Sequence, residues 1–207
     1  MATILTFLTH PGHTSAGELP KHRQLVFLLP TGFTSHRAVA QTAGNVLLRL
    51  ADSLILPLNV SDYGEMLQAM YDTAEQAFQA DLLSNNISLA PLRSAILRFQ
   101  SAAAGLSQRV SHLQNEDSPS PLALRMVNDQ LMLLERTFLN PRAFPDKYYY
   151  SHVILASRSS PVATFPGLAD AVAAAKDQSS WDNVRKHLTV VIQVVENAAS
   201  FLEPVAE

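Results

Sequence analysis

Apolar residues recur at alternating steps of three and four along most of the chain after residue 36. This spacing places them on one face of an α-helix. The clearest stripe lies in residues 122–138, where the apolar positions are Leu124, Val127, Leu131, Leu134 and Phe138. Asn140 and Pro141 follow this stripe, and a residue before proline avoids the helical conformation. The pattern predicts a helix of about five turns that needs a packing partner.

The other face of the same helix is polar. It carries Arg125, Asn128, Asp129, Glu135 and Arg136. Arg125 and Asp129 lie one helical turn apart, which predicts a modest surface ion pair. The pattern therefore predicts that this face of the helix lies at the surface of the folded protein.

Three further long helices are predicted by the same spacing. Their stripes are Val39, Ala43, Val46, Leu47, Leu50 and Leu54; Leu67, Met70, Ala74, Ala77 or Phe78, and Leu82; and Leu92, Ile96, Phe99, Ala103, Leu106, Val110 and Leu113. Pro57 ends the first, and Ser61 or Asp62 is expected to cap the second. Pro91 suits the first turn of the third, because its fixed φ matches a helix start.

A final long helix is predicted after Ser179 and Ser180, the expected caps. Its stripe is Trp181, Val184, Leu188, Val191, Val195, Ala198 and Leu202. Upstream of it, residues 148–150 and 153–155 predict a short extended piece, 157–164 a loop, and 168–176 a short alanine-rich helix. The fold prediction is all-α: an antiparallel bundle of four to five helices over residues 37–207, preceded by an irregular segment, residues 1–36.

Composition and charge exclude several functions. Fifteen Lys and Arg against eighteen Asp and Glu give a net charge of −3, so no basic footprint favours nucleic acid or an anionic membrane. The chain has no cysteine, which excludes disulfides, cysteine-containing zinc sites and thiol nucleophiles. The sequence shows neither a signal-peptide pattern nor an apolar run of roughly 18 residues that would span a membrane.

Catalytic motifs are also missing from the sequence. HExxH, GxSxG and a glycine-rich phosphate loop do not occur. His10 and His13 lack an obvious third ligand, so we interpret them as loop histidines rather than a metal site. We interpret His112 and His187 as structural or solvated, and leave His152, beside the loop, open. Two N-x-S sequons, at Asn59 and Asn86, are possible N-glycosylation sites.

Four segments carry a resemblance to a known family. They read MVNDQLMLLERTFLNPRAFPD, YYSHVILA, ATFPGLADAV and, upstream, AVAQTAGNVLLRLADSLILPLNVSDYGEML. Together they resemble the C-terminal helical region of the glutamate carboxypeptidase and N-acetylated alpha-linked acidic dipeptidase family, which is related to transferrin receptors. The resemblance covers about residues 37–207 and implies a transferrin-receptor-like dimerisation domain.

The resemblance implies more than a fold. Full-length relatives are type II membrane proteins whose zinc exopeptidase domain, on the extracellular side, precedes this region and holds every zinc ligand. The helical region forms the homodimer interface and lends one loop to the substrate pocket. By position that loop is Ser157, Arg158, Ser159, Ser160, Pro161 and Val162. Glutamate-specific relatives carry a Lys-Tyr pair there, so acidic-residue specificity is not expected.

The leading hypothesis is therefore a non-catalytic homodimerisation domain without zinc or another cofactor of its own. The alternative is membership of an M28-type zinc metallopeptidase that is active only in a full-length parent, where the peptidase domain would be a second partner. A hypothesis of another class is an enzyme whose site combines segment 1–36 with Arg158. The remaining hypothesis is a product that folds poorly on its own, because it exposes a surface that in relatives packs against the peptidase domain.

Overall fold

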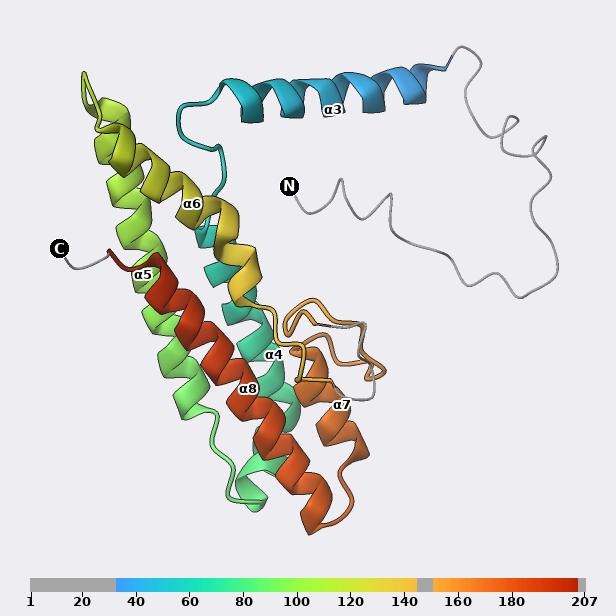
Figure 1. Cartoon of the computed structure of the whole chain (residues 1–207). Helices are drawn as coiled ribbons and strands as arrows, with labels where there is room; N and C mark the ends of the chain where they lie inside the picture. The colour runs from blue at the N-terminus through green and yellow to red at the C-terminus, as the bar shows by residue number, and fades with distance from the viewer. Residues whose placement is uncertain (1–32, 145–150, 205–207) are drawn as a thin grey trace. The chain divides into compact units, whose positions relative to one another are not determined.

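The computed structural model describes residues 33–144 and 151–204. The chain forms two compact units, residues 1–52 and 53–207. The regular elements of the described residues are α-helices, which confirms the all-α prediction (Figure 1). They are α3 (Thr34–Asp52), α4 (Ser61–Ser84), α5 (Ala90–Asn115), α6 (Pro121–Thr137), α7 (Pro166–Ala174) and α8 (Gln178–Leu202).

The first unit contributes one described helix, α3. It ends at Asp52, so Leu54, the last member of the predicted stripe, lies beyond it. None of the residues of α3 is buried, and only Val46 is half-buried. The apolar stripe is therefore not buried within the first unit, and its packing in the bundle core stays a prediction. Periodicity shows which face a helix would bury, but burial itself needs a partner surface.

The second unit is a bundle with one continuous hydrophobic core. Helix α8 packs against α5, α6 and α7, and α5 also packs against α4 and α6 (Figure 1). The predicted stripes of α5 and α8 are buried, except that Val110 and Trp181 at their margins are half-buried. Phe99, Phe138 and Phe165 are fully buried and supply the largest core side chains. The heptad spacing of these helices therefore predicted their core faces correctly.

The caps of two helices differ from the prediction. At α4, neither Ser61 nor Asp62 caps the helix: the Asn59 Oδ1 accepts the Ser61 amide at 3.1 Å. At α8, Asp177 is the N-cap and its Oδ1 accepts the Ser180 amide at 2.8 Å. Ser180 completes a capping box by accepting the Asp177 amide, which satisfies two helix-end donors at once. In both cases the cap lies upstream of the predicted residue, because the helix begins earlier.

The segment before α7 is also irregular where an extended piece was predicted. His152 forms an isolated antiparallel bridge with Leu139, and residues 153–155 form a turn, so that part of the prediction is wrong. Val153 and Ile154 are both buried, which the turn allows and an alternating strand would not. Residues 148–150 lie outside the described residues. The short helix is confirmed as α7, which starts at Pro166, two residues before the predicted start.

Candidate functional site

Helix α6 holds the second unit together through polar residues as well as apolar ones. Three of its polar side chains, Asn128, Gln130 and Glu135, hydrogen-bond to three different parts of the chain. The prediction that the polar face of this helix lies simply at the surface is therefore wrong for Asn128 and Glu135. It is confirmed for Arg125 and Asp129, which form an exposed pair with Nε and Oδ2 3.7 Å apart.

Asn128 ties α6 to the segment that precedes α4. Its Nδ2 donates to the Leu54 carbonyl and its Oδ1 accepts the Leu56 amide, both at 2.9 Å. An amide side chain offers one donor and one acceptor, so it satisfies both backbone groups of an irregular segment. Asn128 thereby fixes residues 54–56 against α6 where no helix or sheet would satisfy them.

Gln130 and Arg109 cap the C-terminal end of α8. Gln130 Nε2 donates to the Phe201 carbonyl at 2.8 Å, and an Arg109 guanidinium nitrogen donates to the Leu202 carbonyl at 2.6 Å. The same guanidinium nitrogen lies 3.2 Å from Gln130 Oε1. Burial lowers the pKa of Arg109. A helix leaves its last carbonyls without intrahelical partners, and here α5 and α6 supply them.

Glu135 joins α6 to α4 and to the segment that leads into the loop. Its two carboxylate oxygens accept the Tyr63 hydroxyl of α4 and His152 Nε2, the latter at 2.9 Å. His152 Nδ1 accepts the Leu155 amide at 3.1 Å, so its ring proton lies on Nε2 and points at Glu135. The Phe138 ring stacks on both Tyr63 and His152, with centroids 5.4 Å and 6.0 Å apart.

The electrostatics of this cluster follow from its hydrogen bonds. The hydrogen bond from His152 lowers the pKa of Glu135, burial opposes that shift, and the Tyr63 hydroxyl adds to it. Burial, followed by the bond to Glu135, raises the pKa of Tyr63 well above its usual range. Glu135 is thus held as a carboxylate and Tyr63 as a neutral hydroxyl. The arrangement ties three segments together, and it answers the open question of His152: this histidine is a structural hydrogen-bonding residue.

The six predicted loop residues form an irregular segment anchored on α7. The amides of Ser159 and Ser160 donate to Asp170 Oδ1 at 2.8 and 2.7 Å. The Ser160 side chain is buried and its hydroxyl accepts the Val162 amide. Ser157, Arg158, Ser159 and Pro161 are exposed, and Val162 is half-buried. A single carboxylate under two successive amides therefore sets the backbone of the loop and leaves Arg158 at its outer side.

In the FPG sequence next to the loop, the glycine, Gly167, is required by close packing. A Cβ on Gly167 would lie 2.5 Å from His187 Nδ1 and 3.0 Å from the Phe144 ring. Only glycine lets α7 approach α8 this closely. Burial lowers the pKa of His187, whose ring lies 5.8 Å from that of Phe144. These contacts support the interpretation of His187 as a structural histidine.

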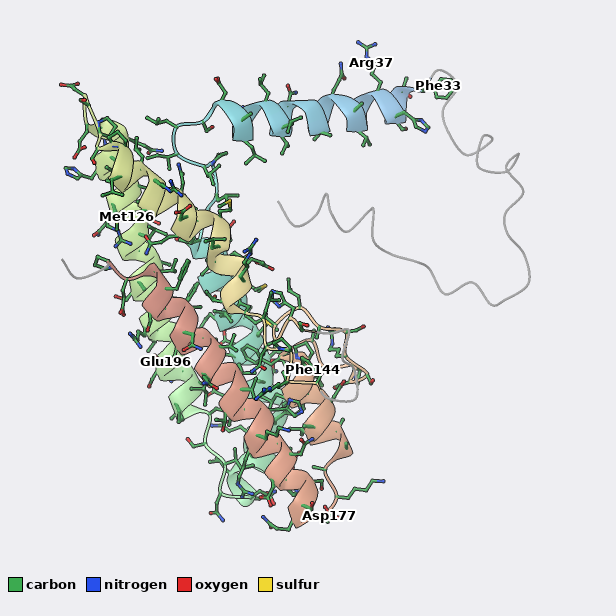
Figure 2. All side chains as sticks on the ribbon, in the orientation of Figure 1. Phe33, Arg37, Met126, Phe144, Asp177 and Glu196 are labelled. Atoms are coloured by element: carbon green, nitrogen blue, oxygen red, sulfur yellow. The ribbon has the colours of Figure 1, made fainter. Side chains whose placement is uncertain are left out.

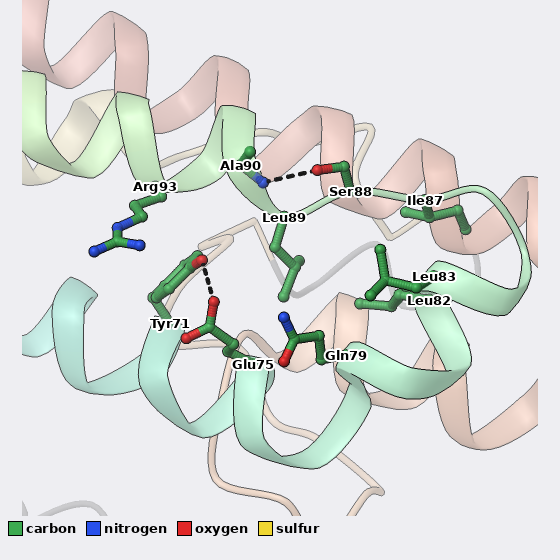
Figure 3. Close-up of a pocket in the computed structure, with 10 residues that line it drawn as sticks. All are labelled: Tyr71, Glu75, Gln79, Leu82, Leu83, Ile87, Ser88, Leu89, Ala90 and Arg93. Atoms are coloured by element: carbon green, nitrogen blue, oxygen red, sulfur yellow. Dashed lines mark hydrogen bonds between the residues drawn. The ribbon is translucent and has the colours of Figure 1, made fainter.

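A small pocket opens between the C-terminal half of α4 and the start of α5 (Figure 3). Its volume is about 180 Å³, below the 300–1,000 Å³ typical of ligand sites. Tyr71 donates to Glu75 Oε1 at 2.7 Å at its polar end, and Leu82, Leu83 and Ile87 line its apolar end. Apolar spacing along the chain does not predict this pocket, because its lining comes from the end of one helix and the start of the next.

Within residues 33–144 and 151–204, no group of three or more metal-ligating side chains converges. His112 pairs with Glu116 at 3.1 Å on the surface of α5. His10 and His13 lie outside the described residues. None of the described helices combines the length and the apolar character that crossing a membrane requires.

Comparison with known proteins gives one family and several relatives. The family described as "Transferrin receptor-like dimerisation domain" matches residues 87–203, which include α5 to α8. The chain is 55% identical to "Aminopeptidase NAALADL1" of Rattus norvegicus over 183 residues, covering 86% of this chain and 24% of the relative. The Mus musculus protein of the same name is 54% identical, with the same coverage.

A plant relative is more distant. "Probable glutamate carboxypeptidase LAMP1" of Arabidopsis thaliana is 29% identical over 177 residues, covering 83% of this chain and 25% of the relative. The chain therefore spans about a quarter of the length of these relatives. The family match includes α6 and all of its anchoring polar residues.

Proposed function

The chain belongs to the family of transferrin receptor-like dimerisation domains, and from this premise we propose that it holds two copies of one protein together through its helical bundle. The observation that carries the proposal is the family match over residues 87–203. That range contains the core-forming helices α5, α6 and α8 together with the loop anchored on α7. The driving term is apolar surface removed from water when the two copies meet.

Sedimentation of the purified chain tests the proposal. A dimer has twice the 22.6 kDa mass of one chain, and its fraction rises with protein concentration. We expect dimer at tens of micromolar, together with one cooperative thermal transition. Mass of a single chain at every concentration would contradict the proposal, and aggregation without a cooperative transition would favour the poorly folding product instead.

We also propose that the loop of residues 157–162 faces the substrate pocket of a peptidase domain in a longer protein. Two observations support this. Asp170 holds the loop backbone through two amides, and Arg158 stays exposed at its outer side. In a longer protein with peptidase activity, Arg158→Ala should change KM for substrates with a free carboxylate, because a guanidinium binds carboxylates. Equal KM values for the Arg158→Ala variant and the unaltered longer protein would contradict this role.

A second candidate function concerns the longer protein as a whole. The relatives named aminopeptidase and glutamate carboxypeptidase favour a zinc exopeptidase whose metal ligands lie in another domain. In that protein the present domain would act by dimerisation and by its loop. The test is zinc content and peptidase turnover of the longer protein beside those of this chain. Stoichiometric zinc in this chain alone would instead favour the enzyme that uses segment 1–36.

By the same resemblance we propose that the domain lies on the extracellular side of a type II membrane protein, with glycans at Asn59 and Asn86. Both asparagines are exposed. Asn59 Nδ2 donates to Asp62 at 2.6 Å, so Asn86 offers the freer amide. Expression through the secretory pathway followed by deglycosylation should give a mass shift that Asn86→Gln reduces. An unchanged mass would overturn the assignment.

A further inference from the structure

Helix α6 carries a second row of residues opposite its buried stripe. Its members are Leu122, Arg125, Asp129, Met132 and Arg136, at steps of three and four. Leu122 is 68% exposed and Met132 56% exposed, although both are large apolar residues. Large apolar side chains that are exposed close together, with charged side chains around them, often mark a contact surface. The row therefore indicates that another surface packs against this side of α6.

The apolar surface extends beyond the row. Met126, labelled in Figure 2, lies on the same helix and is also exposed. Leu133 of this helix is half-buried. A patch of this kind, bounded by charged side chains, is typical of protein–protein contacts. The charged members decide what kind of partner fits it.

Four of the five members of the row lie at symmetric positions before and after Val127. Arg125 and Asp129 lie two positions before and after it, and Leu122 and Met132 lie five positions before and after it. If two copies of α6 cross antiparallel, with the two-fold axis on the exposed side of the helix at the level of the buried Val127, Arg125 of each copy faces Asp129 of the other. Leu122 of each copy then faces Met132 of the other. Two-fold interfaces have this reciprocal form, in which residue i contacts j and j contacts i.

We propose that this row of α6 is the face on which a second copy of the chain docks, with the two helices antiparallel. The inference rests on the proposed dimerisation and adds the surface and the geometry. Within one chain the Arg125 to Asp129 pair is long, 3.7 Å, and the Arg125 side chain is 80% exposed and that of Asp129 47%, so a second copy can compete for both charges. The docked helices place the two reciprocal ion pairs at the centre of the contact, and a Leu122–Met132 contact flanks them on each side.

Charge reversal tests the geometry directly. In Arg125→Asp, two carboxylates of each copy face those of the other, and in Asp129→Arg two guanidinium groups do. Like charges set opposite each other are strongly unfavourable, so each variant alone should dimerise at least about tenfold more weakly than the unaltered chain. An equal mixture of the two variants restores opposite charges at both contacts. We expect the mixture to form a heterodimer within about threefold of the original affinity.

Matched controls separate the interface from a general charge effect. Lys186→Asp on α8 and Asp81→Arg on α4 alter the charge in the same way at exposed positions away from α6. Both controls should dimerise as the unaltered chain does. Circular dichroism melting of each variant shows whether it is folded before its association is measured.

The outcomes distinguish this inference from the proposed function. If the unaltered chain dimerises and both α6 variants dimerise equally well, the α6 face is wrong and the proposed function stands. Folded variants that stay monomeric when mixed would overturn the antiparallel two-fold arrangement. If the unaltered chain is monomeric throughout, the proposed function itself fails.

Discussion

Helices α3 and α6 begin from similar sequence patterns and end in different surroundings. Both carry apolar residues at steps of three and four over about five turns. On α6 four of these residues are buried, whereas on α3 none is. The polar residues differ as well: Asn128 and Gln130 of α6 bind other segments, while Thr42 of α3 bonds back to Ala38 in its own helix. Spacing therefore predicts a helix and its apolar face, and the available partners decide whether that face is buried.

The largest expected difference between the two units comes from core truncation. Phe99 is fully buried in α5, and Leu47 of α3 is 69% exposed. Phe99→Ala should lower the free energy of unfolding by about 3–5 kcal/mol, because it removes a large side chain and leaves a cavity. Leu47→Ala should change it by less than about 0.5 kcal/mol. Urea unfolding monitored by circular dichroism measures both, and equal effects would show that α3 is packed as tightly as α5.

Glycine replacement should have opposite signs in the two units. A Cβ at Gly167 meets His187 Nδ1 at 2.5 Å, and a Cβ at Gly44 meets nothing within 4 Å. Gly167→Ala should destabilise the bundle by about 1–3 kcal/mol through overpacking. Gly44→Ala should favour the α3 helix by about 0.5–1 kcal/mol, because alanine restricts the unfolded chain. Thermal melting and helix content test the pair, and a stabilising Gly167→Ala would disprove the close approach of α7 and α8.

Removal of a polar anchor should have a smaller effect. Gln130 caps the C-terminal end of α8, and Gln41 lies exposed on α3. Gln130→Ala should cost about 1–2 kcal/mol, since the half-buried carbonyls it binds lose a donor. Gln41→Ala is the matched control and should be nearly neutral. Hydrogen exchange at the end of α8 should rise in the first variant alone, and unchanged exchange would contradict the capping role.

The smallest expected effect is a dependence on pH. The folded-state pKa of Glu135 is lowered from its ordinary 4.5, so its contribution to stability is present above that pH and is lost as the pH falls below it. Glu135→Gln should therefore flatten the decline in stability below about pH 4.5. Asp52→Asn, at the end of α3, serves as the control. Melting temperatures measured from pH 6 down to pH 3 would refute the account if both variants decline as the unaltered chain does.

The bundle was predictable from the sequence because its core stripes hold one spacing over many turns. The stripes of α5 and α8 show this best: nearly every predicted member is buried. Helix starts were less predictable. Asp177, not Ser179, caps α8. Several residues that can cap a helix follow one another here, and the residue that does so depends on where the first helical turn begins.

The polar contacts of the domain were not predictable in the same way. Asn128 and Glu135 read as surface residues because they share a helix face with Arg125. Their partners, Leu54 and Tyr63, are more than 70 positions away, and local spacing carries no information on such contacts. The resemblance located the loop of residues 157–162, but its anchor on Asp170 emerged only from the fold. The domain boundary expected after residue 36 remains a prediction.

Native mass spectrometry of an equal mixture of isotope-labelled and unlabelled chain tests the central claim of dimerisation most directly. The account predicts three dimer masses, in which the hybrid of one labelled and one unlabelled chain is the most abundant because the copies exchange freely. Each of these masses would be about twice the 22.6 kDa of one chain. Single-chain masses alone, at concentrations where the protein remains folded, would contradict it.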